Sequence, residues 1–215
     1  KIMLIIFISL IIDNFFILKI NTPPPWDQGY HLSNVFKMYN VLEDKAINIS
    51  EKLNQLLNIT DSYRGPLTYF ISALFMKFFN NSYQYAYLSN QIFNIISIIS
   101  IFNLGKILKD ESTGIWASII FSFSSLILNQ RSDYLIDLSL TSFSTLGFLF
   151  FTKWYLDKRS FNYYSSLSGI LLGFIFLTRP TGIIIFTFPL ILIILKIIKR
   201  KNKFNDSLKE LIFFF

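Results

Sequence analysis

Residues 86–105 read AYLSNQIFNIISIISIFNLG and contain no charged side chain. One helical crossing of a bilayer needs roughly 17 to 25 mostly apolar residues, so this stretch is long enough to span a membrane. The rest of the chain has a similar composition. Of its 215 residues, 53% are apolar and only 15% are charged, whereas soluble domains carry about 25% charged residues. We therefore predict an all-α polytopic membrane protein.

Other apolar stretches of similar length occur on both sides of this one. The predicted crossings are residues 2–20, 86–105, 113–129, 138–155, 163–178 and 181–198. A further apolar stretch, residues 66–79, is too short for a crossing and favours an interfacial or re-entrant helix. Its Tyr and Phe side chains suit the headgroup boundary of a bilayer.

The distribution of basic residues tests this assignment. If residues 66–79 do not cross, most of the 20 Lys and Arg residues lie on short inner segments, including the cluster 199–203, as the positive-inside rule requires. An additional crossing would place that cluster outside. Residues 21–85 then form a long first outer loop that carries surface helices. The formal charge of +7 is explained by these inner segments, and we expect no nucleic-acid partner.

Composition also excludes several kinds of site. The chain has no Cys and a single His, which excludes disulfide scaffolds, thiol nucleophiles, zinc-thiolate sites and multi-histidine metal sites. It starts at Lys1 and stops within the apolar run 211–215. From these ends we expect a truncated piece of a longer protein, with residues 1–215 forming one transmembrane module.

The outer loop carries the first candidate functional residues. After three prolines, apolar residues recur at helical spacing up to about Leu42, which predicts an amphipathic helix on the membrane surface. Asp27 falls at the start of this helix. It is either an N-cap or a base that the helix dipole keeps ionised. His31 follows one turn later and shares the face of Asp27.

Four short motifs, in this order, give the chain a family resemblance. They are Trp26-Asp27-Gln28 followed by a Tyr-His helix, Tyr63-Arg64-Gly65-Pro66, Arg131-Ser-Asp-Tyr-Leu-Ile-Asp137 and Leu177-Thr-Arg-Pro180. In this order they resemble the GT-C glycosyltransferases. Within that superfamily the chain is most similar to bacterial relatives of dolichyl-phosphate-mannose-protein mannosyltransferases and of lipid A aminoarabinose transferase. The resemblance implies a GT-C-like N-terminal transmembrane module.

The resemblance also implies an activity and partners. Such transferases move a sugar from a polyprenyl-phosphate donor to an acceptor protein or glycolipid, here on the outer face of a bacterial inner or plasma membrane. Asp27 matches the family's acidic residue in the first loop, which acts on the acceptor hydroxyl. A positioned carboxylate base contributes typically 10² to 10⁴-fold to such a reaction. Many relatives have Asp-Glu here, whereas Gln28 leaves this chain with one carboxylate.

The donor's leaving phosphate requires fixed positive charge near the outer surface. Arg64 and Arg179 are the candidates by position. Arg179 matches the family's lysine position and can bind phosphate bidentately, while Arg64 lies one residue earlier than the family's basic residue. The alternative for both is snorkelling toward lipid headgroups.

The second outer loop contains two acidic residues four positions apart, Asp133 and Asp137. Asp137 enters an apolar stretch and matches the family's second acidic motif, so we assign it a catalytic role. Asp133 either contributes to substrate binding, as does His31, or pairs with Arg131. In some relatives this motif positions a divalent metal, and the sequence leaves metal dependence open.

A non-catalytic transporter or lipid-handling protein is the alternative function. Its ionisable residues should line a path through the membrane. Here the five candidates Asp27, Arg64, Asp133, Asp137 and Arg179 all map to one outer face, which favours the transferase. Asp13, inside the first crossing, matches no motif; we expect it to face another helix or to lie near the outer boundary.

Overall fold

The computed structural model describes residues 1–19, 26–61, 63–79, 82–157 and 163–199. Within these ranges the chain is helical and contains no β-strand, which confirms the predicted all-α membrane-type fold. The elements are α1 (Ile2–Lys19), α2 (Trp26–Glu43), α3 (Ile49–Asn58), α4 (Leu67–Phe79), α5 (Tyr83–Ala86), α6 (Leu88–Leu108), α7 (Glu111–Phe123), α8 (Ser125–Ser132), α9 (Asp137–Leu156), α10 (Tyr163–Thr178), the 3-10 helix η1 (Pro180–Phe186) and α11 (Thr187–Lys199).

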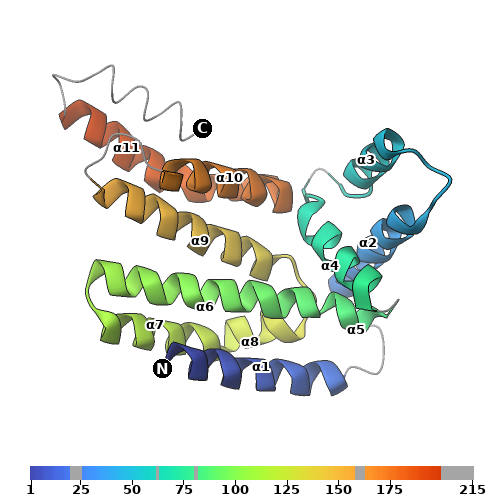
Figure 1. Cartoon of the computed structure of the whole chain (residues 1–215), viewed down its shortest axis with the longest axis horizontal. Coiled ribbons are helices and arrows are strands. Elements are labelled where there is room, and N and C mark those ends of the chain that lie inside the picture. Colours follow the sequence, from blue (N-terminus) through green and yellow to red (C-terminus); the bar gives the residue numbers. More distant parts are fainter. Residues whose placement is uncertain (20–25, 62, 80–81, 158–162, 200–215) are drawn as a thin grey trace.

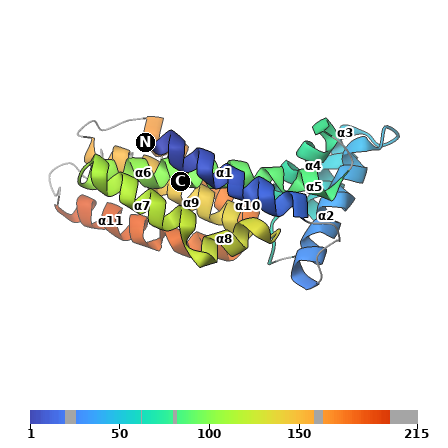
Figure 2. The same ribbon diagram turned by 90° about the horizontal axis from the view of Figure 1, so that it is seen from below.

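α1 and α6 to α11 lie side by side, and α2 to α5 gather at one end of them (Figures 1 and 2). α6 packs against α7 and α9, α9 packs against α10, and α1 packs against α6 and α7. α1, α8 and α10 each end toward the α2–α5 end of the bundle (Figure 1). The segments that we predicted as outer loops therefore lie at the same end of the bundle.

Two of the predicted crossings differ from the helices of the structure. Residues 113–129 were expected to form one helix, but α7 and α8 meet at 55°. Ser124 separates them because its backbone is extended (φ −65°, ψ 140°) and it begins a new helix. Residues 181–198 begin as the 3-10 helix η1, which starts at Pro180 and passes into α11.

By length and composition, one described helix is sufficient to cross a membrane, the continuous unit Tyr83–Leu108. The bent pair α7 and α8 makes a second if it counts as one span. Shorter apolar helices are Ile2–Ile17, Leu67–Phe79, Tyr163–Thr178 and Pro180–Leu192. The helix at 67–79 agrees with the predicted short outer-loop helix, and the number of six crossings stays a prediction.

Two apolar cores support the candidate site. The bundle core joins α6, α9, α10 and η1, with Phe93, Leu138, Trp154, Ile175 and Phe186 all buried. The second core joins α2, α4 and α5 to the connection before α9 through buried side chains that include Val35, Met38, Tyr69, Met76 and Tyr134. The second core holds the outer-loop helices against the end of the bundle.

A buried ion pair links α1 to α8. Arg131 Nε and Nη2 lie 2.6 and 2.5 Å from Asp13 Oδ1, and the guanidinium also donates to the carbonyl oxygens of Ser9 and Ser122. Asn94 of α6 donates to the other oxygen of Asp13. Asp13 therefore faces neighbouring helices, and the suggested pairing of Arg131 with Asp133 is wrong. Burial explains this choice, because a charge inside the bundle requires a partner there.

Candidate functional site

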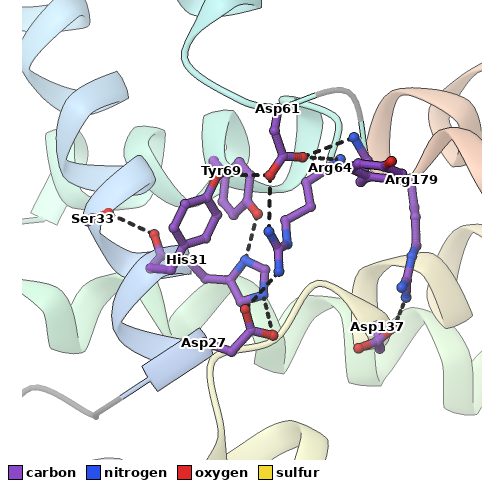
Figure 3. A network of polar contacts seen from close by, with 10 residues as sticks. Asp27, His31, Ser33, Asp61, Arg64, Tyr69, Asp137 and Arg179 are labelled. Carbon is purple, nitrogen blue, oxygen red and sulfur yellow. Dashed lines mark hydrogen bonds and ion pairs between the residues drawn. The ribbon is translucent and has the colours of Figure 1, made fainter.

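Two segments that are far apart in the sequence meet at the α2–α5 end of the bundle. The Gly65 N–H, just before α4, donates to the carbonyl oxygen of Thr178 at the end of α10, over 2.9 Å. A Cβ atom on Gly65 would lie 1.9 Å from the carbonyl oxygen of Leu177, so only glycine allows this approach. The contact places Arg64 and Arg179 in the same region (Figure 3).

Arg64 bridges two carboxylates. Its Nη2 donates to Asp27 Oδ1 over 2.8 Å and its Nη1 donates to Asp61 Oδ2 over 3.0 Å. Asp61 Oδ1 in turn accepts the backbone N–H groups of Tyr63 and Arg64, both at 2.9 Å. Sequence analysis did not include Asp61 in the site. The signal was an Asp three residues before an Arg in a turn, where Asp side chains commonly accept backbone N–H groups.

The ring of Tyr30 completes this cluster. The guanidinium carbon of Arg64 lies 4.7 Å from the ring centroid, and the Tyr30 hydroxyl donates to Asp61 Oδ2 over 3.1 Å. Desolvation alone would raise the pKa of Asp61. Hydrogen bonds from the Tyr63 backbone, Tyr30 and Arg64 outweigh it and lower the pKa below its ordinary value. Asp61 is therefore ionised at neutral pH and helps to hold Arg64.

Asp27 and His31 lie on the same face of α2, as predicted. The carboxylate of Asp27 is 58% exposed and the side chain of His31 is 2% exposed, with Asp27 Oδ2 3.6 Å from His31 Nε2. The described helix begins at Trp26, so Asp27 lies in the first helical turn rather than before it. Its carboxylate still lies near the positive end of the helix dipole.

The sequence predicts His31 as a substrate-binding residue, and in the structure its side chain is buried. Its Nδ1 lies 2.6 Å from the hydroxyl oxygen of Tyr69, and the two rings stack with centroids 5.6 Å apart. Burial lowers the pKa of His31, although the charge of Asp27 opposes this shift. The imidazole is therefore neutral at pH 7, and it lies on the buried side of the Asp27 carboxylate.

A second ion pair lies beside the first (Figure 3). Arg179 Nη1 donates to Asp137 Oδ1 over 2.8 Å, with the two side chains 45% and 37% exposed. Asp137 is the first residue of α9, and Arg179 directly follows α10. Asp133 caps the C-terminus of α8 with an extended backbone. It therefore does not share a helix with Asp137, although a spacing of four residues is typical of one helical face. Its side chain makes no hydrogen bond or ion pair with the other predicted site residues, which are all described in the structure: Asp27, His31, Arg64, Asp137 and Arg179.

The two arginines differ in their free donors. Arg64 uses both terminal amino groups on carboxylates. Within the described part of the chain, the Arg179 side chain donates from Nη1 to Asp137. A guanidinium carries five N–H donors in a planar fork, so Arg179 retains an edge that can bind a phosphate. Arg64 is better placed to orient Asp27.

The acidic residues of this cluster do not fit a metal site. In the ranges that the structure describes, no three His, Asp or Glu side chains are close enough to hold a metal ion. Asp27 and Asp61 both face the positive charge of Arg64.

An apolar pocket of about 200 Å³ adjoins the cluster. Its lining combines α3 with the start of α4 and the end of α10. The lining residues are Leu53, Leu56, Leu57, Pro66, Leu67, Phe70 and Leu177. Pro66 and Leu177 each lie two positions from one of the two arginines, so charged and apolar binding surfaces are adjacent.

A family model described as dolichyl-phosphate-mannose-protein mannosyltransferase matches residues 63–215. No curated protein and no solved structure matches the chain. The matched range includes Arg64, Asp137 and Arg179, and it begins after Asp27 and His31.

Proposed function

Since the chain belongs to the dolichyl-phosphate-mannose-protein mannosyltransferase family, a family of membrane glycosyltransferases, we propose that it transfers a sugar from a polyprenyl-phosphate donor to an acceptor hydroxyl. The reaction takes place at the outer end of the bundle, facing the periplasm or the exterior. The observation that carries this proposal is that two ion pairs, Arg64–Asp27 and Arg179–Asp137, lie together at that end, and that the carboxylate of Asp27 is half-exposed.

In the proposed reaction Asp27 acts as the base. It takes the proton of the acceptor hydroxyl while the hydroxyl oxygen forms a bond to the anomeric carbon of the sugar. The bond between that carbon and the phosphate oxygen breaks, and its electron pair leaves with the lipid phosphate. Asp27 suits this role because 58% of its side chain is exposed and Arg64 donates to only one of its oxygens.

Arg179 stabilises the departing phosphate. The charge on the phosphate increases as the glycosidic bond breaks, and a fixed guanidinium stabilises this charge in the transition state. Asp137 orients Arg179 through the 2.8 Å contact between Nη1 and Oδ1. Asp61 and Arg64 hold Asp27 in the same way. The site thus has an acceptor side at the start of α2 and a donor side at the α9–α10 end.

The apolar pocket supports a lipid-linked donor. It adjoins Arg64 and Arg179 and is lined by leucine, proline and phenylalanine side chains. An isoprenoid chain can bury carbon atoms there while its phosphate reaches Arg179. An acceptor hydroxyl on a protein or a glycolipid then approaches Asp27 from the exposed side.

The buried pair Asp13–Arg131 bears on the transporter alternative, because charges along a transport path should face that path. These two side chains are 4% and 1% exposed and are hydrogen-bonded to each other and to neighbouring backbone. They hold helices together, and the remaining candidate charges lie at one end. This distribution favours the transferase.

The test is sugar transfer in membranes that contain the full-length open reading frame, with a panel of labelled polyprenyl-phosphate sugars. We expect turnover by the wild type and a loss of at least about 100-fold in Asp27→Asn. Asp44→Asn is the matched control, because Asp44 is an exposed outer-loop aspartate whose side chain accepts the Ala46 N–H. Wild-type turnover that Asp27→Asn retains would remove Asp27 from the base role, and no turnover by inserted wild type would contradict the transferase.

A further inference from the structure

The buried pair formed by His31 and Tyr69 is a feature that the proposed reaction does not yet use. Tyr69 of α4 is completely buried and His31 of α2 is nearly so. Their polar atoms, Tyr69 Oη and His31 Nδ1, lie only 2.6 Å apart. The other ring nitrogen, Nε2, faces Asp27 Oδ2 at 3.6 Å. The three side chains therefore form a row from the core to the exposed carboxylate (Figure 3).

Hydrogen-bond chemistry limits the arrangement of protons in this row. Asp27 accepts a charge-assisted hydrogen bond from Arg64, and an ionised carboxylate can only accept. A neutral imidazole has one N–H and one bare nitrogen. If the bare nitrogen were Nε2, its lone pair would face the carboxylate and repel it. The N–H therefore belongs on Nε2, which leaves Nδ1 as an acceptor for the Tyr69 hydroxyl.

Burial is consistent with both protonation states. It lowers the pKa of His31, which keeps the ring neutral, and it raises the pKa of Tyr69, which keeps the phenol protonated. The charged and titratable groups around His31 are Asp27 and Tyr30 on its own helix, Arg64 before α4, Tyr69 on α4 and Asp137 on α9.

We propose that Tyr69, by donating its hydroxyl to His31 Nδ1, stabilises the tautomer that Asp27 favours, so that His31 Nε2–H points at Asp27 and holds its carboxylate in position for the acceptor hydroxyl. The inference rests on the proposed function, in which Asp27 is the base. Both residues act as positioning residues, because neither reaches the surface where the substrate binds. The distance of 3.6 Å exceeds that of a hydrogen bond, and contacts of this kind often shorten when substrate binds.

The first experiment observes the tautomer directly and does not depend on activity. Nitrogen NMR of isotope-labelled histidine in the full-length protein, purified without a histidine tag, distinguishes a protonated from a bare ring nitrogen. The chain has one histidine, and the signal that disappears in His31→Gln identifies it. We expect protonated Nε2 and bare Nδ1 in the wild type, and a mixture of tautomers in Tyr69→Phe. Protonated Nδ1 in the wild type, or an unchanged tautomer in Tyr69→Phe, would overturn the proposal.

The second experiment is a double-mutant cycle on sugar transfer. Tyr69→Phe keeps the stacked ring and removes the hydroxyl. We expect kcat to fall about tenfold with KM for the donor unchanged, since loss of the hydrogen-bond partner on the far ring nitrogen of a functional histidine has effects of about this size. In His31→Gln the side-chain amide donates to Asp27 without help from Tyr69. Adding Tyr69→Phe to His31→Gln should therefore change kcat less than about twofold.

Matched controls separate this role from packing. Tyr134 is another completely buried tyrosine of the same core, and its hydroxyl donates to Ser72 instead of His31. Tyr134→Phe should leave the His31 tautomer unchanged. Equal losses from Tyr69→Phe in the wild-type and His31→Gln backgrounds would show that Tyr69 acts only through packing. If the wild type transfers no sugar, the proposed function fails, and the NMR result still tests the link between Tyr69 and His31.

Discussion

Two arginine–aspartate pairs in this chain have similar contact distances and very different surroundings. Arg131 and Asp13 lie 2.5 Å apart with 1% and 4% of their side chains exposed. Arg64 and Asp27 lie 2.8 Å apart with 31% and 58% exposed. The first pair lies inside the helix bundle, and the second lies at its outer end.

The difference in burial gives two pairs of the same residue types different roles. Inside the bundle Nε, Nη1 and Nη2 of Arg131 all donate to groups of the protein, namely Asp13, Ser122 and Ser9. Arg131 is therefore not oriented toward a ligand. Removing one member leaves an unpaired buried charge, which costs about 3–5 kcal/mol. An exposed pair contributes about 0–1 kcal/mol to stability. Asp27 and Arg64 therefore contribute little to stability and keep carboxylate oxygens open to substrate.

The largest effect on stability is expected from breaking the buried pair. Asp13→Leu should lower the free energy of unfolding by about 3–5 kcal/mol because Arg131 remains buried without its partner. Denaturation of the purified protein in detergent measures this loss. The double variant Asp13→Leu with Arg131→Met removes both charges and should recover most of the stability. A double variant as unstable as the single one would contradict this account of the pair.

The next effect concerns donor binding at the outer end. Arg179→Ala should raise KM for the polyprenyl-phosphate donor about tenfold, because the phosphate loses its guanidinium. Arg179→Lys retains the charge without the planar fork and should fall between the two. Steady-state kinetics with varied donor concentration measure both variants. A KM that Arg179→Ala leaves unchanged would exclude Arg179 from the donor site.

A smaller effect is expected on stability when the exposed pair is broken. Asp27→Asn should change the free energy of unfolding by less than about 1 kcal/mol, because water and Asp61 still solvate Arg64. Thermal unfolding of the same preparations used for Asp13→Leu allows a direct comparison. A loss as large as that of Asp13→Leu would mean that the contrast in burial does not separate the two pairs.

The smallest effect is a change in acid stability. Burial lowers the pKa of His31 below its ordinary value of 6.5, so the unfolded chain binds a proton in a pH range where the folded chain does not. The contribution of His31 to the free energy of unfolding is therefore fully present above about pH 6.5, and it decreases as the pH falls toward the lowered pKa. His31→Gln should remove this slope, which unfolding measured across that pH range tests. The groups facing His31, namely Asp27, Tyr30, Arg64, Tyr69 and Asp137, are all retained in this variant.

Much of the fold and part of the candidate site could be predicted from local patterns. Apolar run length predicted α1, α6, α9 and α10 closely, because a continuous apolar run of this length can be recognised without knowing which helices pack against it. The break between α7 and α8 was missed, since Ser124 is not a strong helix breaker, although its backbone is extended in the structure. Helical periodicity likewise predicted that Asp27 and His31 share one face of α2.

The partners of the charged residues could not be predicted in this way. Arg131 was weighed against the nearby Asp133, and the structure pairs it with Asp13 across the bundle. Asp61 was not placed in the site, and the sequence did not predict that His31, on the same face as Asp27, is buried. In each case spacing along the chain identifies neighbours on one helix, while a long side chain takes its partner from whichever helix packs beside it.

By itself the sequence determined that this protein is an all-α membrane-type chain of its family, with acidic and basic residues in segments that alternate with apolar runs. These properties follow from composition, run length and motif order, which are local. Only the tertiary structure decided which charges are buried and which are open, because burial depends on the meeting of segments such as Gly65 and Thr178. That meeting places Asp27, Arg64, Asp137 and Arg179 at one end of the bundle, as the proposed transfer reaction requires.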